Sequence, residues 1–215
     1  MESLKISEVV IATKNEGKIR EFVQIFNKVG LGKRVNVSSL LDYGDAPLII
    51  EDGETFSENA LIKARAVAGM KSIDKGAVIV IADDSGIEVD ALGGRPGVNS
   101  ARYAGLGATD EQNNTKLISE LSGVKEGERQ ANFTIAIAIT SIGSSRKEDV
   151  VIGHCPGTIT MAPRGKKGFG YDPFFYYPPL KKTFAEMDDV QKNEISHRRI
   201  AIEKLAEILP DYLEK

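Results

Sequence analysis

The sequence has little cysteine, no excess of positive charge and no internal repeats among its 215 residues. Its single cysteine, Cys155, excludes a disulfide within the chain and, without Cys or His companions at ligand spacing, a zinc site. We expect Cys155 to be a small buried side chain on a strand. The net charge of −3 argues against a general nucleic-acid-binding protein, which normally carries a basic surplus.

Long apolar runs are absent as well. The longest fall far short of the ~20 residues that span a bilayer, and the first ten residues, MESLKISEVV, lack the apolar stretch of a secretory signal. We therefore expect a cytoplasmic protein with no membrane partner. The hydrophobic content of 41% is that of an ordinary globular protein, and the length suits one domain, 1–215, with a substantial core.

Two common nucleotide-binding motifs are also missing. The chain contains neither the Walker pattern GxxxxGK followed by Ser or Thr nor the pattern GxGxxG. Kinase-like and dinucleotide-binding interpretations therefore lose most of their support.

A polar turn at 13–18 follows an expected strand at 8–12 and precedes a segment with apolar residues at helical spacing. The N–H groups and the dipole of the first helical turn face this turn, where Thr13, Asn15 and Lys18 add a hydroxyl, an amide and an ammonium. The pattern predicts an anion site. The same residues would also occur if Thr13 and Asn15 were only helix caps and the lysines were solvated charges. That alternative to an anion site stays open.

A pair of adjacent carboxylates, Asp83 and Asp84, follows the apolar run at 77–81. We expect the pair where that strand stops, with Ser85 and Gly86 turning the chain sharply. Adjacent carboxylates repel each other, and a partly buried anion needs a cation, a metal ion or hydrogen-bond donors, so a divalent metal ion is the natural partner. An ordinary solvated turn would contain the same residue types.

A capping box at Thr55 to Glu58 predicts the start of a second helix. Glu58 suits the helix dipole, whereas Glu51 lies before the helix and is freer to bind a metal ion. Lys63, inside the helix, either reaches a phosphate or faces solvent.

The second half of the chain predicts further strands and helices. They are a helix that begins at Thr109 and ends near Gly123, a long strand at 131–139 with one face in the core, strands at 149–154, 157–161 and 174–177, and a final helix from Ser196. Elements that alternate in the first half and strands that cluster later indicate an α/β fold.

Glycine, aromatic and charged residues interleave at 168–173. Phe169 beside glycines can stack on a base, and Asp172 can accept from a purine N–H, although a turn pinned by aromatic packing explains the same residues. His197 and Arg198 fall in the first turn of the final helix, where the helix dipole disfavours cations. Binding of a ligand anion or a polar base would explain basic residues at these positions.

Six motifs occur in the order found in the inosine triphosphate pyrophosphatases, and together they cover nearly the whole chain. They are TKNEGK at 13–18, TFSENA at 55–60, DDSG at 83–86, PGVNSARY at 96–103, GFGYDP at 168–173 and SHR at 196–198. The sequence therefore resembles this family, whose members hydrolyse dITP, ITP and XTP. It departs from the family pattern at Asn99, where an aromatic residue is expected, and at Met187, where leucine is expected.

The resemblance implies an α/β fold with a long mixed β-sheet, flanking helices and two lobes around a central cleft, in a homodimer. It also implies cleavage between the α- and β-phosphates of non-standard purine nucleoside triphosphates with magnesium, Mg²⁺, as the cofactor. The products would be a nucleoside monophosphate and pyrophosphate, and the reaction would cleanse the nucleotide pool.

The resemblance further implies roles for individual residues. Asp84 would be the general base and, with Glu51, a metal ligand, and Asp83 would support them. Residues in the first half of the chain would hold the polyphosphate, namely Thr13, Lys14, Asn15, Glu16, Gly17, Lys18, Lys63 and Ser85. Residues in the second half of the chain would form the base pocket, namely Phe169, Gly170, Tyr171, Asp172, Lys192, His197 and Arg198.

Two other function classes stay open from the residues alone. Asp83 and Asp84 could be the metal pair of a sugar-nucleotide transferase, which would release a nucleoside diphosphate and need an acceptor. The chain could also be a nucleotide-sensing module that binds triphosphate without turnover. Incubation with ITP and Mg²⁺, followed by separate assays for pyrophosphate and orthophosphate, distinguishes the three.

Overall fold

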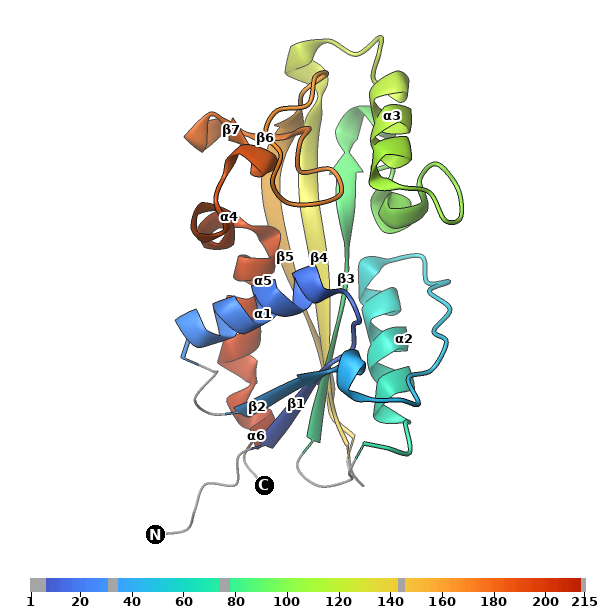
Figure 1. Ribbon diagram of the computed structural model, residues 1–215, viewed down its shortest axis with the longest axis vertical. Coiled ribbons are helices and arrows are strands. Elements are labelled where there is room, and N and C mark those ends of the chain that lie inside the picture. Colours follow the sequence, from blue (N-terminus) through green and yellow to red (C-terminus); the bar gives the residue numbers. More distant parts are fainter. Residues whose placement is uncertain (1–6, 31–34, 74–77, 143–145, 214–215) are drawn as a thin grey trace. The chain divides into compact units, whose positions relative to one another are not determined.

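The structure, a computed structural model, describes residues 7–30, 35–73, 78–142 and 146–213 (Figure 1). Its strands form one sheet in the order β2-β1-β3-β4-β5-β6-β7. Their bounds are β1 Ser7–Ile11, β2 Val35–Ser39, β3 Val78–Val89, β4 Gln130–Ser141, β5 Glu148–Ile159, β6 Phe175–Tyr177 and β7 Lys182–Thr183. β1 pairs parallel with β2 and β3, whereas β6 pairs antiparallel with β5 and β7. The sheet is therefore mixed.

Helices accompany the strands along the chain. They are α1 Glu16–Lys28, α2 Phe56–Ala68, α3 Asp110–Glu120, α4 Asp189–Ile195, α5 His197–Ile208 and α6 Pro210–Leu213. Among the described residues, no helix combines the length and the apolar character needed to cross a lipid bilayer. The predicted α/β fold with a mixed sheet and flanking helices is confirmed.

The chain divides into two compact units. The first unit contains Met1–Asp84, Ala136–Gly153 and Arg198–Lys215, and the second contains Ser85–Ile135 and His154–His197. The predicted single domain with two lobes and a central cleft stays a prediction.

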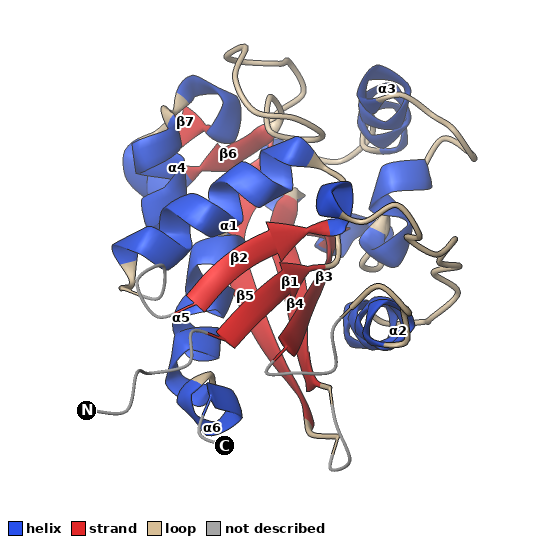
Figure 2. Cartoon of the chain, turned by 60° about the horizontal axis from the view of Figure 1, so that its bottom comes forward, coloured by secondary structure: helices blue, strands red, loops and turns tan. Residues whose placement is uncertain are grey.

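Parallel strands and helices on both sides build the first unit. α2 lies on one side of β1 and β3, and α5 lies on the other (Figure 2). Residues 9–11 and 78–82 are all buried, as expected for parallel strands that are covered on both faces. On α1, Phe22, Ile25 and Phe26 are buried as well.

Aromatic rings dominate the core of the second unit. The Phe133 ring packs against Phe175, with ring centroids 4.6 Å apart, and against Phe184 at 5.5 Å. Met187 is also buried in this core, where a thioether side chain fills about the same volume as leucine. Cys155 lies buried in the same core on β5, as predicted, and burial raises its pKa to about 12.

The helix starts that the sequence predicts are confirmed. Asn15 caps α1 by accepting from Lys18 N, and Thr55 and Thr109 form capping boxes at the starts of α2 and α3. Gly30 follows the end of α1 with φ +81°, a conformation that glycine adopts without strain.

β3 does not stop at the two aspartates, so the predicted sharp turn at Ser85 and Gly86 is wrong. The strand continues to Val89, and Ile87 and Val89 are fully buried. Because these later apolar residues join the core of the second unit, extended backbone is retained through the polar segment.

β5 is one strand, whereas the sequence predicts two strands, at 149–154 and 157–161. Gly157 keeps the strand close to β6, since a Cβ at this position would lie 2.5 Å from the Phe175 ring. β4 is buried on both faces instead of one, because Ala136 and Ala138 are as buried as the isoleucines between which they lie. α4 is not predicted, and its seven residues are too short to show helical periodicity.

Candidate active site

Asp83 is the centre of a buried ion-pair cluster in the first unit. Lys18 Nζ donates to Asp83 Oδ2 at 2.8 Å, and Arg198 Nη2 lies 3.7 Å from the same oxygen. Arg198 also pairs with Glu21 of α1. Burial alone raises the pKa of Asp83, but Lys18, Arg198 and Lys63 outweigh it and hold the pKa well below its usual range. Asp83 is therefore an ionised carboxylate that anchors α1 and α5 to the sheet.

Asp84 has a different set of partners. Neighbouring residues of a strand point to opposite faces, and Asp84 faces α2, where Asn59 Nδ2 donates to its Oδ2 at 3.0 Å. Lys63 Nζ lies 3.5 Å from Asp84 Oδ1. Burial raises the Asp84 pKa more than Lys63 and Asn59 lower it. A carboxylate with a raised pKa is a stronger proton acceptor than an ordinary aspartate.

Glu51 and Asp84 converge on one positive centre. Lys63 Nζ lies 3.0 Å from Glu51 Oε2 and 3.5 Å from Asp84 Oδ1. Burial lowers the pKa of Lys63, but Asp83, Asp84 and Glu51 together raise it, so the lysine stays charged. Two carboxylates that both face one cation can also hold a divalent ion.

The described residues contain no group of three or more His, Cys, Asp or Glu side chains that could enclose a metal ion. Mg²⁺ is usually held by one or two carboxylates, with waters and substrate phosphates supplying the other ligands. The pair formed by Glu51 and Asp84 fits that pattern of coordination.

The turn between β1 and α1 presents polar groups at a helix N-terminus. Asn15 N donates to Thr13 Oγ1 at 3.2 Å, and Asn15 Oδ1 accepts from Lys18 N at 3.1 Å. Lys14, Asn15 and Glu16 are exposed, and Gly17 is half-buried. The first-turn N–H groups and the dipole of a 13-residue helix are therefore open to an anion from solvent.

The loop at 168–172 in the second unit is held by a buried carboxylate. Asp172 Oδ2 accepts from Phe169 N at 3.0 Å and from Lys192 Nζ at 2.7 Å. The Lys192 ammonium also lies 4.8 Å from the centroid of the Phe169 ring, which is 42% exposed. Gly168 is required here, because a Cβ would lie 1.9 Å from Asp172 Oδ2.

Tyr171 and His197 belong to the core of the second unit. Tyr171 Oη donates to Ser100 O at 2.8 Å, and burial raises the Tyr171 pKa. The His197 ring stacks on Phe133 with centroids 5.0 Å apart. His197 and Arg198 are consecutive residues, yet His197 packs in the second unit and Arg198 pairs with Asp83 in the first.

The candidate site residues thus form one set in each unit. The first set comprises Thr13, Lys14, Asn15, Glu16, Gly17, Lys18, Glu51, Lys63, Asp84 and Arg198, and the second comprises Ser85, Phe169, Gly170, Tyr171, Asp172, Lys192 and His197. The structure brings Glu51, Lys63 and Asp84 into contact, and likewise Phe169, Asp172 and Lys192. Their functional roles stay predictions.

Two residues of the site are not predicted from the sequence, Asn59 and Glu21. Asn59 is fully buried, donates to Asp84 and lies four residues before Lys63. Glu21 pairs with Arg198 and lies three residues after Lys18. Residues three or four apart share a face of a helix. That spacing from a candidate lysine is the signal that could have identified them.

Comparison with known proteins gives consistent matches along the chain. The model of the Ham1 family matches residues 9–208. A dITP/XTP pyrophosphatase of Geobacillus kaustophilus is 52% identical over 202 residues, 94% of each chain, and one of Bacillus licheniformis is 49% identical over 204 residues, 95% of this chain and 98% of the other. The solved Ham1 protein of Staphylococcus aureus superimposes with a TM-score of 0.80 at 40% identity, covering 95% of this chain and 99% of that one.

Proposed function

Because the chain belongs to the Ham1 family, we propose that it hydrolyses the non-standard purine nucleoside triphosphates dITP, ITP and XTP to a nucleoside monophosphate and pyrophosphate. Relatives named dITP/XTP pyrophosphatases support the substrate class over nearly the full length of the chain. The observation that carries the chemistry is the position of Asp84, a buried carboxylate with a raised pKa that shares Lys63 with Glu51.

Glu51 and Asp84 would hold the metal ion, which we propose to be Mg²⁺. When bound, Mg²⁺ neutralises charge on the phosphate oxygens of the substrate. Lys63 contacts both carboxylates and remains charged, so it can stabilise negative charge that develops on the leaving pyrophosphate.

Asp84 would act on the attacking water. Asn59 holds one carboxylate oxygen, which fixes the orientation of the group, and the other oxygen can accept the proton of the water. The water oxygen would form a bond to the α-phosphorus, while the bond from this phosphorus to the oxygen that bridges the α- and β-phosphates breaks. Pyrophosphate departs with the electron pair of that bond.

The turn between β1 and α1 would hold the polyphosphate. Thr13, Asn15 and Lys18 surround the N-terminus of α1, where N–H groups and the helix dipole favour an anion. The Lys18 ammonium uses one donor on Asp83 and has two left for phosphate oxygens.

The second unit would hold the purine base. The Phe169 ring is partly exposed and can stack on a base, which contributes ~1–3 kcal/mol for an aromatic side chain. Asp172 and Lys192 lie beside that ring and offer an acceptor and a donor. Ser85 follows Asp84 directly on β3 and is partly buried, and it is proposed to contact phosphate.

The test of the proposed function is a product assay. Incubation of the protein with ITP and Mg²⁺ should release IMP and pyrophosphate in equal amounts, with no orthophosphate and no need for an acceptor. A sugar-nucleotide transferase would instead release a nucleoside diphosphate, and a sensor would bind ITP without turnover. Either of those results would contradict the proposal.

Base selectivity gives a second prediction. Hypoxanthine and xanthine present an O6 acceptor and an N1–H donor, whereas adenine presents the reverse, so a pocket that pairs with the first pattern leaves groups unpaired against adenine. We expect kcat/KM for ITP and XTP to exceed that for ATP at least about a hundredfold, which requires only ~2.7 kcal/mol. Steady-state kinetics with ITP, XTP, GTP and ATP measure it, and equal efficiency on ITP and ATP would contradict it.

A third prediction concerns Lys18. Lys18→Ala should weaken binding of a non-hydrolysable ITP analogue by about ten- to a hundredfold, because a charge-assisted hydrogen bond contributes ~1.5–3 kcal/mol, while IMP binding changes little. Titration calorimetry measures both ligands.

The matched control for Lys18 is Arg20→Ala, which removes one positive charge from an exposed position of the same helix. An equal loss for the analogue and for IMP in Lys18→Ala would mean that Lys18 does not contact the polyphosphate.

The remaining expectations about partners are also proposals. A homodimer is supported by the resemblance to the family, and light scattering of the purified protein tests it. The cytoplasmic location and the lack of nucleic-acid and membrane partners stay predictions.

A further inference from the structure

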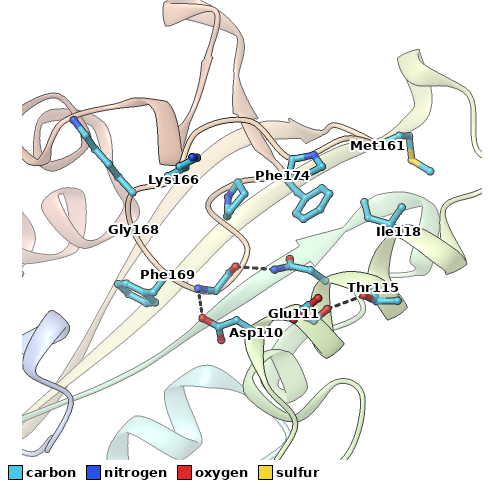
Figure 3. A pocket seen from close by; sticks show the side chains of 14 residues that line it. Asp110, Glu111, Thr115, Ile118, Met161, Lys166, Gly168, Phe169 and Phe174 are labelled. Carbon is cyan, nitrogen blue, oxygen red and sulfur yellow. Dashed lines mark hydrogen bonds between the residues drawn. The ribbon is translucent and has the colours of Figure 1, made fainter.

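Helix α3 binds both polar groups of Gly170, on the loop that carries Phe169. Gly170 N donates to Asp110 Oδ2 at 2.7 Å, and Asn114 Nδ2 donates to Gly170 O at 2.9 Å (Figure 3). Asp110 and Asn114 are four residues apart and therefore share one face of α3. Gly170 has φ +60°, a left-handed conformation that residues with a side chain adopt only with strain.

Hydrogen bonds, and not packing, hold the loop on this side. A pocket of about 620 Å³ lies between α3 and the loop, with Ile118, Met161 and Phe174 among the residues that line it (Figure 3). Side chains that fill space would fix a loop by contact, but here the loop borders open volume. The two bonds from α3 to Gly170 therefore hold the side of the loop that borders the pocket, while Tyr171 and Asp172 hold its other side.

Burial of the Asn114 side chain costs free energy that its contribution to packing does not explain. Its side chain is 8% exposed, and within the described part of the chain its Oδ1 has no hydrogen-bond partner. An unpaired buried acceptor costs free energy that an apolar side chain of similar size would avoid. The bond from Asn114 Nδ2 to Gly170 is the contact that this amide provides and an apolar residue cannot.

Phe169 is thereby fixed from both sides. Its own N–H donates to Asp172 at 3.0 Å, and the next residue along the chain is held by α3. Phe169 stays 42% exposed and the Lys192 ammonium lies over one face of its ring, so part of the side chain is accessible to a ligand.

We propose that Asp110 and Asn114 are positioning residues that hold the Phe169 ring in the orientation that stacks on the substrate base. The inference rests on the proposed function, in which Phe169 contacts the purine. Asp110 and Asn114 act through the Gly170 peptide and do not touch the substrate themselves.

Asp110→Ala should raise KM for ITP by about five- to thirtyfold, since part of one base-stacking contact is lost, while kcat stays within about twofold. The control is Glu111→Ala. Glu111 is also an acidic residue of the first turn of α3 and lines the same pocket, so the control removes the same charge next to the helix dipole but leaves Gly170 bound. KM should not change in the control.

Two further measurements separate positioning from general damage. The inhibition constant of tripolyphosphate should be the same in wild type and Asp110→Ala, because this ligand has no base to stack. Asp110→Asn, which keeps an acceptor for Gly170 N, should restore most of the wild-type KM. Asn114→Leu should reproduce the KM increase through the other bond while retaining thermal stability, because leucine removes the unpaired acceptor.

A double-mutant cycle supplies the decisive result. In a Phe169→Ala background, Asp110→Ala should have almost no further effect on KM, because residues that act through one contact are not additive. Additive effects of the two substitutions, or weaker tripolyphosphate binding in Asp110→Ala, would overturn the inference. Failure of wild type to convert ITP into IMP and pyrophosphate would instead contradict the proposed function, so the two failures are distinguishable.

Discussion

Asp84→Asn is expected to lower kcat for ITP hydrolysis by about 10²–10⁴-fold, the range for loss of a general base. The amide has nearly the same size as the carboxylate and can still accept from Asn59 at 3.0 Å, but it cannot take a proton from water. Single-turnover kinetics with saturating ITP would measure the chemical step directly. Turnover within about threefold of wild type in a folded variant would remove Asp84 from the mechanism.

The stability of Asp84→Asn should not fall with its activity. Burial raises the pKa of Asp84, which means that the folded protein already disfavours the ionised form of this group. Lys63 retains Glu51 as a partner after the substitution. We therefore expect the free energy of unfolding in urea to stay the same or rise slightly, and this measurement serves as the internal control for the kinetic loss.

Asp83→Asn should give the opposite result and destabilise the protein by ~3–5 kcal/mol, as is usual when one partner of a buried ion pair is removed. The carboxylate is 2% exposed and faces both Lys18 and Arg198. Its loss leaves two cations in a buried environment with less compensating negative charge. For a chain of 215 residues, each kcal/mol shifts Tm by about 2–4 °C, so calorimetry should detect a decrease of about 6–20 °C.

The effect of Asp83→Asn should depend on pH in a defined direction. The pKa of Asp83 is lower in the folded state than in the unfolded state, so its contribution is complete above the ordinary aspartate pKa and is lost as pH falls through the folded-state pKa. The difference in unfolding free energy between wild type and variant should therefore shrink below about pH 4, measured in a chelator. The control is Asp90→Asn, an exposed aspartate in the 3-10 helix Asp90–Leu92. A difference that stays constant from pH 6 to pH 3 would contradict the ion-pair explanation.

Local features of the fold could be predicted from the sequence because they depend on neighbouring residues. The starts of α1, α2 and α3 follow from Asn15, Thr55 and Thr109, whose side chains accept from backbone N–H groups three residues later. The extent of β3 could not be predicted in this way. Its polar centre resembles a turn, and the strand continues because Ile87 and Val89 are buried by residues distant in the sequence.

The same distinction applies to the candidate site. The residue types at 13–18, 83–86 and 168–173 indicate phosphate, metal and base chemistry, but partners that lie far away along the chain decide what each group does. The sequence alone does not distinguish the roles of the adjacent aspartates Asp83 and Asp84. Lys18, 65 residues away, makes the first an ion-pair anchor, and Asn59 fixes the second. Arg198, predicted for the base pocket, pairs with Glu21 and Asp83, so its part in reading the base stays a prediction.

Asp83 and Asp84 point to opposite faces of β3. Their different roles therefore depend on the register of the strand as much as on the chemistry of the carboxylates. Deletion of one residue from 78–82 would carry Asp84 into the place of Asp83 and Ser85 into the place of Asp84. Such a chain would keep both carboxylates, yet a hydroxyl would stand where a proton acceptor is needed. Natural or engineered variation in this run should therefore tolerate exchanges among valine, isoleucine and alanine far better than any change in its length.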